Sequence, residues 1–210
     1  MADLSEDYRH RFARDGYLIV EDCIDPVDIE QILRIWRADA QLASEVKENA
    51  NFDGEEGART RLAYRPHLTA DAYGALAQSA RVVGPLEQIF DATVQHYYTL
   101  NMQKDPGTGG WEYHQDYGYH YREFLYPDFV SVMVALDAAT RENGCLRVVR
   151  GSHMLGRLEH EPFGSQQIAN RERVALALEE MEEVHCEMSA GSVLYFHGNI
   201  LHASDANVSD

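Results

Sequence analysis

Two short segments that lie far apart in the chain constrain its fold more than any other feature of the sequence. The first, residues 111–116, reads WEYHQD, and the second, residues 201–204, reads LHAS. Because residues i and i+2 of an extended strand face the same side, His114 and Asp116 can point to one position. Two imidazoles and a carboxylate on one face of an octahedral Fe(II) leave the other face open for a cosubstrate and dioxygen. A fold that carries His202 to this pair would complete such a centre.

These residues alone leave alternatives open. An HxD pair often occurs by chance and is then a polar strand face at the surface. Zinc accepts the same ligands with one position open, which is compatible with a cupin-like metal-dependent isomerase or hydrolase. An inactive jelly-roll binding protein is a third alternative. His197, which follows Phe196 at a strand end, competes with His202 as the third ligand.

Three further segments accompany the first two. They read NGCL at residues 143–146, GSH at 151–153 and AGSVLYF at 190–196. In their order and separation the five segments resemble the phytanoyl-CoA dioxygenase family of Fe(II)/2-oxoglutarate-dependent oxygenases, from about Phe12 to the last residue. The resemblance implies a dioxygenase that uses Fe(II), 2-oxoglutarate and dioxygen. It also implies hydroxylation of a small molecule at a C–H bond, with decarboxylation of 2-oxoglutarate to succinate.

The resemblance also assigns roles to individual residues. It makes His114, Asp116 and His202 the catalytic residues and the metal ligands. Because position 116 is a carboxylate, no coordination position is vacated for chloride, and hydroxylation is favoured over halogenation. The residues predicted to bind the cosubstrate are Asn101, Ser204 and Trp111.

The far carboxylate of 2-oxoglutarate needs an arginine, because a bidentate charge-assisted pair fixes a dianion in a mostly apolar pocket. The family places this arginine shortly after the distal histidine, beyond Asp210. We therefore expect the chain to lack both this arginine and the final strand or strands of the fold. The alternative is that Arg147 or Arg150 reaches into the pocket from a neighbouring strand.

Aromatic residues with polar tips crowd the HxD segment. Such a wall suits a cationic or ring-bearing small molecule through stacking or cation–π contact, although core packing explains about half of these residues equally well. We predict a pocket beside the metal, lined by Asn101, Trp111, Tyr113 and His120. The residues predicted to contact the substrate are Tyr113, Tyr117, His120 and Arg157.

Within the family the HxD segment is most similar to that of ectoine hydroxylase. However, Tyr97, Thr99 and His120 stand where that enzyme has Gln, Arg and Trp. Ectoine is therefore not predicted as the substrate.

The charge of the chain excludes two classes of partner. A formal net charge of −17 argues against binding to nucleic acid and against docking on anionic lipid. The cysteines, Cys23, Cys145 and Cys186, have no CxxC spacing, which is typical of reduced thiols. The N-terminus is unlike a signal peptide, and no apolar run approaches the ~20 residues of a membrane span. We expect a soluble cytoplasmic protein that is a monomer or a weak homo-oligomer.

At 210 residues the chain is most simply one domain, with a helical N-terminal layer over about residues 5–91 and a jelly-roll core over about residues 94–210. A loop over Asn49–Arg61 is predicted to be a lid or a solvated connector. Helices are predicted at residues 5–14, from Pro26, at 69–79, 82–91 and 171–182. Strands are predicted at residues 16–20, 94–103, 111–116, 129–136, 145–149, 184–188 and 192–196. Many short strands in one domain favour a mainly β fold, a double-stranded β-helix or cupin-like jelly roll, with the N-terminal helices buttressing one sheet.

Overall fold

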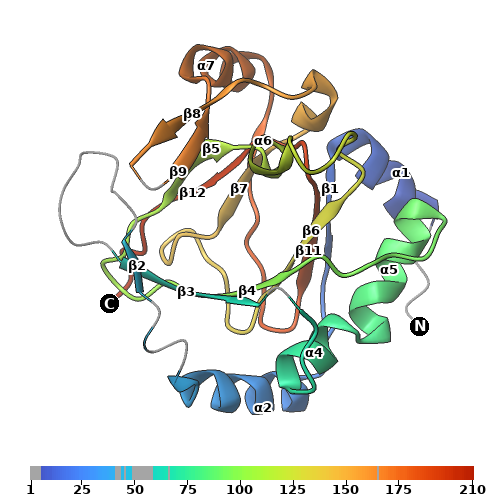
Figure 1. Ribbon diagram of the computed structural model, residues 1–210, viewed down its shortest axis with the longest axis vertical. Helices are drawn as coiled ribbons and strands as arrows, with labels where there is room; N and C mark the ends of the chain where they lie inside the picture. The colour runs from blue at the N-terminus through green and yellow to red at the C-terminus, as the bar shows by residue number, and fades with distance from the viewer. Residues whose placement is uncertain (1–5, 41–43, 45, 49–58, 66, 165) are drawn as a thin grey trace.

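Two antiparallel sheets form the centre of the molecule (Figure 1). The computed structural model describes residues 6–40, 44, 46–48, 59–65, 67–164 and 166–210. Buried apolar side chains of both sheets meet in a shared core, among them Val148 of one sheet and Leu194 and Phe196 of the other. The two sheets therefore pack face to face, as the predicted jelly roll requires.

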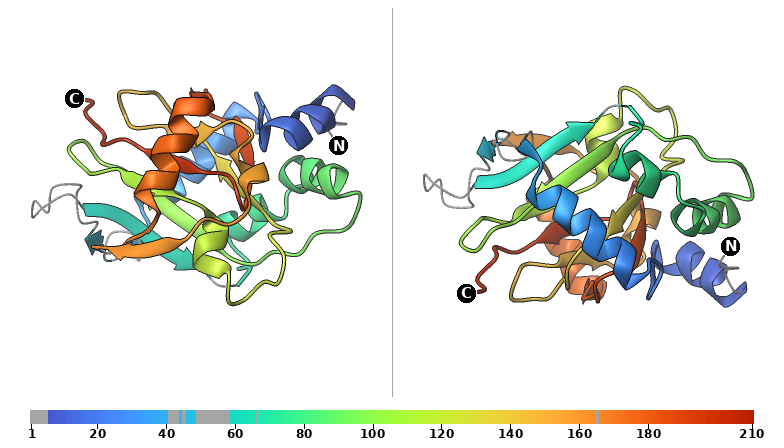
Figure 2. Two further views of the ribbon diagram at one scale, coloured as in Figure 1. Left: turned by 90° about the horizontal axis from the view of Figure 1, so that it is seen from above. Right: turned by 90° about the horizontal axis from the view of Figure 1, so that it is seen from below.

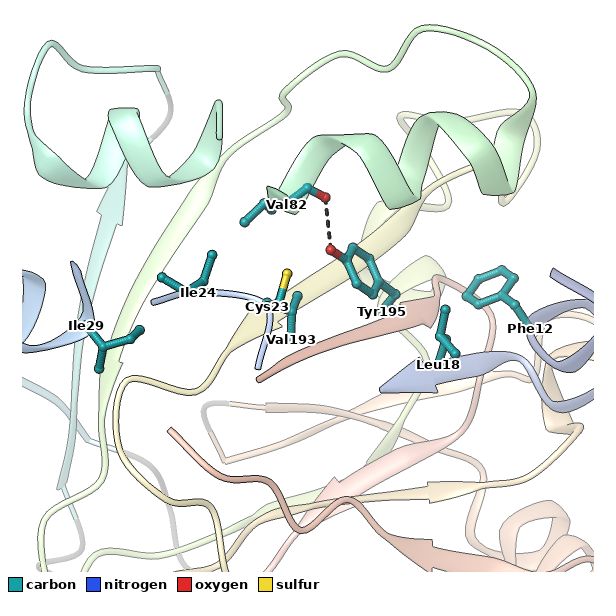
Figure 3. Packing of buried hydrophobic residues seen from close by; sticks show 8 residues of the cluster. All are labelled: Phe12, Leu18, Cys23, Ile24, Ile29, Val82, Val193 and Tyr195. Atoms are coloured by element: carbon teal, nitrogen blue, oxygen red, sulfur yellow. Dashed lines mark hydrogen bonds between the residues drawn. The ribbon is translucent and has the colours of Figure 1, made fainter. Parts of the chain in front are cut away.

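The first sheet has three strands. Their order is β1 (Tyr17–Val20), β11 (Val193–His197) and β6 (Val130–Val134). The helices that cover its outer face are α1 (Glu6–Asp15), α2 (Pro26–Arg37) and α5 (Ala80–Phe90). Side chains of these helices and of the sheet form one cluster, in which the hydroxyl of Tyr195 donates to the carbonyl of Val82 at 3.0 Å (Figure 3). The prediction that N-terminal helices buttress one sheet is confirmed.

The start of α2 follows the prediction, with Asp25 as N-cap and Pro26 as the first helical residue. Ile29 and Ile32 are buried, so the helix lays one apolar stripe on the core. The Asp25 carboxylate makes no capping hydrogen bond and instead pairs with Arg81 at 2.8 Å. This ion pair joins the start of α2 to α5.

The second sheet carries the HxD segment. Its order is β10 (Glu183–His185), β7 (Leu146–Val149), β12 (His202–Ser204) and β5 (Trp111–His114). Helix α7 (Arg171–Glu180) packs on the outer face of this sheet. Its Val174 and Ala177 lie in one cluster with Val149 of β7 and with Leu201, which directly precedes β12. Seen from above the molecule α7 lies in front, and seen from below α2 does, so the two outer faces carry different helices (Figure 2).

The remaining elements surround these sheets. A third sheet contains β2 (Val46–Glu48), β3 (Arg59–Arg65) and β4 (Thr99–Gln103), and a two-stranded sheet contains β8 (His160–Phe163) and β9 (Gln166–Ala169). The short helices are α4 (Ala72–Ala77), α6 (Asp116–His120) and the 3₁₀ helix η1 (Ser152–Leu155). No helix in the described part of the chain is long and apolar enough to cross a membrane.

Strand β3 was not predicted. It begins at Arg59, inside the loop expected over Asn49–Arg61, of which residues 49–58 lie outside the described part of the chain. Its sequence, RTRLAYR, has no continuous run of apolar or β-branched residues, and three of its seven residues are arginines. Pairing with β4 stabilises the strand, and Leu62 and Ala63 are buried there.

Other boundaries also differ from the prediction. The strand expected from residue 94 begins only at Thr99, and β8 and β9 were not predicted. Strand β8 reads HEPF, in which proline and a charged residue give no strand signal. The apolar run over 129–136 favours a buried strand, but the residues of β6 within it are half-buried, because β6 is an edge strand of its sheet.

Candidate metal centre

Three side chains from distant parts of the chain converge on the inner face of the second sheet. His114 ends β5, Asp116 begins α6 and His202 begins β12. The Nε2 atoms of His114 and His202 lie 3.8 Å and 3.5 Å from Oδ1 of Asp116. One ligand atom from each side chain lies within 4.8 Å of the others. The three therefore form a group that can hold one metal ion.

Strand pairing explains how the distal histidine arrives. His202 is directly opposite His114 in the β5–β12 ladder and opposite Val148 in the β7–β12 ladder. Residues that face each other across an antiparallel pair project to the same side. Their imidazole centroids are accordingly 4.1 Å apart.

The local geometry of the HxD segment differs from the predicted continuous strand. Strand β5 ends at His114, Gln115 is the one extended residue with φ −117° and ψ 134°, and Asp116 starts a helix. The i and i+2 relation therefore depends on the backbone of Gln115 alone. Beyond Asp116 the chain turns into α6.

Backbone carbonyls fix the tautomer of both histidines. Nδ1 of His114 lies 2.7 Å from the carbonyl oxygen of Glu112, and Nδ1 of His202 lies 3.1 Å from that of Ile200. Because a carbonyl only accepts, each Nδ1 carries the hydrogen and each Nε2 keeps its lone pair. Both lone pairs are on the nitrogens nearest Asp116, as a metal site requires.

The ionisation of the group also suits a cation. Burial and the neighbouring His202 ring lower the pKa of His114, so this imidazole is neutral at physiological pH. Burial alone would raise the pKa of Asp116, but His202, His114 and the hydroxyl of Ser131 outweigh it and lower the pKa. Neutral imidazoles and an ionised carboxylate are the forms that bind metal.

His197 lies outside this group among the described residues. Its Nδ1 accepts the backbone N–H of Asn199 at 3.0 Å, and its ring packs 5.3 Å from that of His153. Burial and His153 lower the pKa of His197 to about 4. The structure therefore brings His202, and not His197, to His114 and Asp116.

The lowered pKa of His197 makes stability depend on pH. The unfolded side chain takes up a proton near pH 6.5 and the folded one near pH 4. The contribution of His197 to the free energy of unfolding is therefore fully present above pH 6.5. It is lost as the pH falls from 6.5 towards 4, by up to about 1.4 kcal/mol per pH unit for one histidine. We expect His197→Asn, which keeps an acceptor for the Asn199 N–H, to show a shallower loss. Urea unfolding of both proteins across this range measures the slopes, and equal slopes would contradict the prediction.

Two of the predicted cosubstrate residues present unpaired donors. Nδ2 of Asn101 and Nε1 of Trp111 are buried and have no hydrogen-bond partner in the described structure. Buried donors are normally paired, so both are available to an acceptor that fills the site. The Trp111 ring lies 6.4 Å from that of His114. Such donors fit the carboxylate and keto oxygens of a 2-oxo acid.

The third predicted cosubstrate residue is already engaged. The hydroxyl of Ser204 accepts a hydrogen bond from the ammonium of Lys104 at 3.1 Å. The same ammonium donates to the carbonyls of Gly144 and Asp205. Burial lowers the pKa of Lys104 to about 8. Sequence reasoning did not single out Lys104, which lies directly after β4.

The alternative that Arg147 or Arg150 reaches into the pocket is wrong. Arg147 is opposite Ala203, one residue out of phase with His202, and therefore projects to the outer face. There it pairs with Glu183 at 3.2 Å. Arg150 pairs with Glu182 at 2.7 Å, on the side of the molecule near α1.

Tyr113 is not where the pocket prediction placed it. In the β5–β12 ladder His202 is opposite His114 and Ser204 is opposite Trp111. Strand β5 therefore advances three residues while β12 advances two. Alternation from His114 turns Tyr113 to the outer face, and the β-bulge leaves Glu112 on that face as well. Both line a cavity of about 430 Å³ together with residues of α7. The guanidinium of Arg147 lies over the Tyr113 ring there, 5.4 Å from its centroid. The predicted pocket beside the metal therefore loses Tyr113.

The other predicted substrate residues, His120, Tyr117 and Arg157, have different surroundings. His120 belongs to an aromatic cluster, with its Nε2 3.1 Å from the hydroxyl of Tyr98. His120 ends α6, the short helix that Asp116 begins, so this cluster lies close to the metal ligands. Burial, and after it the charge of Asp116, raises the pKa of Tyr98. Tyr117, by contrast, is buried and donates to the carbonyl of Leu125 at 2.9 Å, which is a packing role. Arg157 lies 4.1 Å over the Tyr121 ring.

Ser131 is a site residue that sequence reasoning missed. It is opposite Phe196 in the β6–β11 ladder, so it projects into the core between the sheets. Its hydroxyl donates to Oδ2 of Asp116 and leaves Oδ1 facing the two histidines. A single serine within the apolar run 129–136 was the available signal.

The comparison with protein families decides the identity of this site. The model of the family described as Phytanoyl-CoA dioxygenase (PhyH) matches residues 12–210, nearly the whole chain. The chain belongs to the phytanoyl-CoA dioxygenase family. Members of this family are 2-oxoglutarate-dependent non-haem iron dioxygenases that use Fe(II), 2-oxoglutarate and dioxygen, and the His114, Asp116 and His202 group fits such a metal.

Individual members of the phytanoyl-CoA dioxygenase family are only distantly similar to this chain. It is 26% identical to an L-proline trans-4-hydroxylase of Streptomyces griseoviridis, over 97% of this chain and 81% of the relative. It is 27% identical to an ectoine dioxygenase of Bordetella parapertussis, over 98% of this chain and 71% of the relative.

Solved structures show the same fold. The apo form of EctD from S. alaskensis superposes with a TM-score of 0.79 at 22% identity, over 98% of this chain and 72% of that one. The epimerase SnoN in complex with Fe³⁺, alpha ketoglutarate and nogalamycin RO superposes with a TM-score of 0.75 at 20% identity, over 98% and 78%. The predicted jelly roll is confirmed.

Proposed function

We propose that this dioxygenase hydroxylates a small molecule at a C–H bond, with decarboxylation of 2-oxoglutarate to succinate. The observation that carries the proposal is the convergence of two imidazole Nε2 atoms and one carboxylate oxygen, within 4.8 Å of one another. His114, Asp116 and His202 would hold the iron. The bound metal would supply the activation of dioxygen that C–H oxidation needs.

The protein's own contribution is binding and orientation. Nδ1 hydrogen bonds to Glu112 and Ile200 keep the two imidazoles in the tautomer that binds metal. In the proposal, the unpaired donors of Asn101 and Trp111 bind the oxygens of the cosubstrate, and Ser204 reaches its far end. The buried ring of Phe196, 5.0 Å from that of His202, limits the access of water to the ligands.

The substrate would lie against the aromatic cluster beside Asp116. His120 packs 5.4 Å from Tyr97 and 5.6 Å from Tyr98, and Phe129 packs 6.0 Å from His120. Faces of this kind bind a cation or a ring. The related enzymes named for L-proline and ectoine point in the same direction, to a small molecule that carries both a ring and charge.

The setting proposed for the enzyme follows from its composition. We expect one oxygenase domain, monomeric or weakly homo-oligomeric, in the cytoplasm. Its charge of −17 disfavours nucleic acid and anionic lipid as partners. The cysteines Cys23, Cys145 and Cys186 are free and buried, which suits a reducing compartment.

Release of succinate tests the proposed function. Protein incubated with Fe(II), 2-oxoglutarate and a panel of cyclic and cationic amino-acid derivatives should release succinate in step with a product that has gained one oxygen atom. Omission of Fe(II) or of 2-oxoglutarate should reduce the release to background. Succinate without an oxygenated product would support the dioxygenase class but contradict hydroxylation, and a product of unchanged composition would indicate an epimerase.

A further inference from the structure

The β8–β9 hairpin holds the backbone on both sides of His114. Nε2 of His160, in β8, accepts the backbone N–H of Gln115 at 3.0 Å. Oε1 of Gln166, in β9, accepts the backbone N–H of Glu112 at 2.9 Å. Both acceptors come from outside the four-stranded sheet, so they add constraints that strand pairing does not supply.

We propose that His160 and Gln166 are positioning residues of the metal centre, which fix the segment that carries His114 and Asp116 in the geometry the metal needs before the metal binds. This inference rests on the proposed function, because it requires that the three converging side chains bind a metal. Neither residue belongs to the ligand group, so both would act through the backbone.

Gln166 acts on the bulge in β5. Its acceptor takes the N–H of Glu112, and the carbonyl of Glu112 in turn accepts Nδ1 of His114 at 2.7 Å. A bulge leaves backbone groups outside the ladder, and here a buried side chain satisfies one of them. Fixing Glu112 therefore fixes the acceptor that orients the His114 ring.

His160 acts on the single extended residue between the two ligands. Its Nδ1 lies 2.9 Å from the carbonyl oxygen of Leu158, so Nδ1 carries the hydrogen and Nε2 must accept. Gly118 of α6 lies against this end of the ring, where an added Cβ would be 2.3 Å from Nε2. The hydrogen bond thus holds Gln115 in the conformation that aims both His114 and Asp116 inward.

The side chain of Gln115 extends this constraint to the distal histidine. It is fully buried, and its Nε2 donates to the carbonyls of Asn199 and Gly156, each at 2.8 Å. Its Oε1 accepts the N–H of Leu158 at 2.8 Å. Asn199 precedes His202 by three residues. The side chain of Gln115 therefore connects the HxD segment to the segment before β8 and to the segment that leads to His202.

A purely structural role for these hydrogen bonds predicts a different result from a positioning role. Loss of a buried acceptor lowers stability in either case. Only a positioning role lowers the affinity for metal in protein that is still fully folded. Second-layer partners of metal ligands change metal affinity by about 10- to 100-fold when they are removed.

The experiment uses Co(II) as the probe, titrated into the metal-free full chain and followed by calorimetry and by the visible absorption spectrum of the bound ion. His160→Leu and Gln166→Met remove the acceptors, and each should weaken Co(II) binding by about 10- to 100-fold. His160→Gln keeps an acceptor at the position of Nε2 and should bind close to wild type. Gln167→Met is the matched control, because its side chain faces the other side of β9 and should leave affinity unchanged.

The outcomes separate this inference from the proposed function. Wild-type affinity and an unchanged Co(II) spectrum in folded His160→Leu and Gln166→Met would overturn the positioning role. Failure of the wild type itself to bind Co(II) would instead reject the metal centre. Circular dichroism establishes folding, and because the two positions are independent, misfolding of one variant leaves the other to decide.

Discussion

His202→Ala is expected to abolish metal binding, whereas His197→Ala is expected to bind metal as the wild type does. His202 supplies one of the three converging atoms, and its Nε2 lies 3.5 Å from Oδ1 of Asp116. Its removal leaves two ligands. The affinity for metal should therefore fall by more than about 100-fold, which is the upper range for removal of a residue that only supports a ligand. Succinate release should fall to background with it.

Calorimetric titration of both metal-free variants with Fe(II) under anaerobic conditions measures this difference. His197 is a matched control because it is a half-buried histidine in the same part of the chain, engaged with the backbone of Asn199. Retention of tight binding by His202→Ala would show that the third ligand has been assigned to the wrong residue. The comparison is made below the unfolding temperature of each variant.

Leu194→Ala is expected to destabilise the protein by about 3 kcal/mol, within the range measured for buried leucines. Leu194 is completely buried in the core between the two sheets, with Val148 and Phe196. The truncation leaves a cavity that two hydrogen-bonded sheets cannot easily close. For a chain of this size, such a loss lowers the unfolding temperature by about 6 to 12 °C.

Leu125→Ala is the matched control for this change. Leu125 is 81% exposed, so the same truncation should change stability by no more than about 0.5 kcal/mol. Urea unfolding of the two variants gives both values. Equal effects would mean that the two sheets do not share one core.

The three converging side chains could be predicted from the sequence because each has a local signature. The HxD spacing survives in the structure even though Asp116 begins a helix, since one extended residue is enough to align His114 with Asp116. The distal histidine was recognised by the motif around it, and the ladder explains its place opposite His114. The helices were predicted within a few residues because their apolar stripes are periodic.

The surroundings of the ligands could not be read in the same way. Tyr113 was placed in the pocket, but as the neighbour of His114 it projects to the other face of the strand. The bulge that brings Trp111 to the inner face leaves no clear trace in one sequence. Arg147 and Arg150 were considered as anchors because they could reach in from a neighbouring strand, whereas the strand phase turns Arg147 outward and Arg150 pairs with Glu182. The contacts of the β8–β9 hairpin with the HxD segment come from His160 and Gln166, which only the folded structure brings beside it.

The bulge in β5 has a consequence for how this site tolerates changes in chain length. Strand β5 carries one residue more than its partner between the two paired positions, so Trp111 and His114, three residues apart, lie opposite Ser204 and His202 on one face of the sheet. Deletion of one residue at position 112 or 113 would remove the bulge and place the two side chains two residues apart, still on that face. The carbonyl two residues before His114, which orients its imidazole, would then belong to Trp111 in place of Glu112. A single-codon deletion could thus change the support of His114 without replacing any residue of the metal centre.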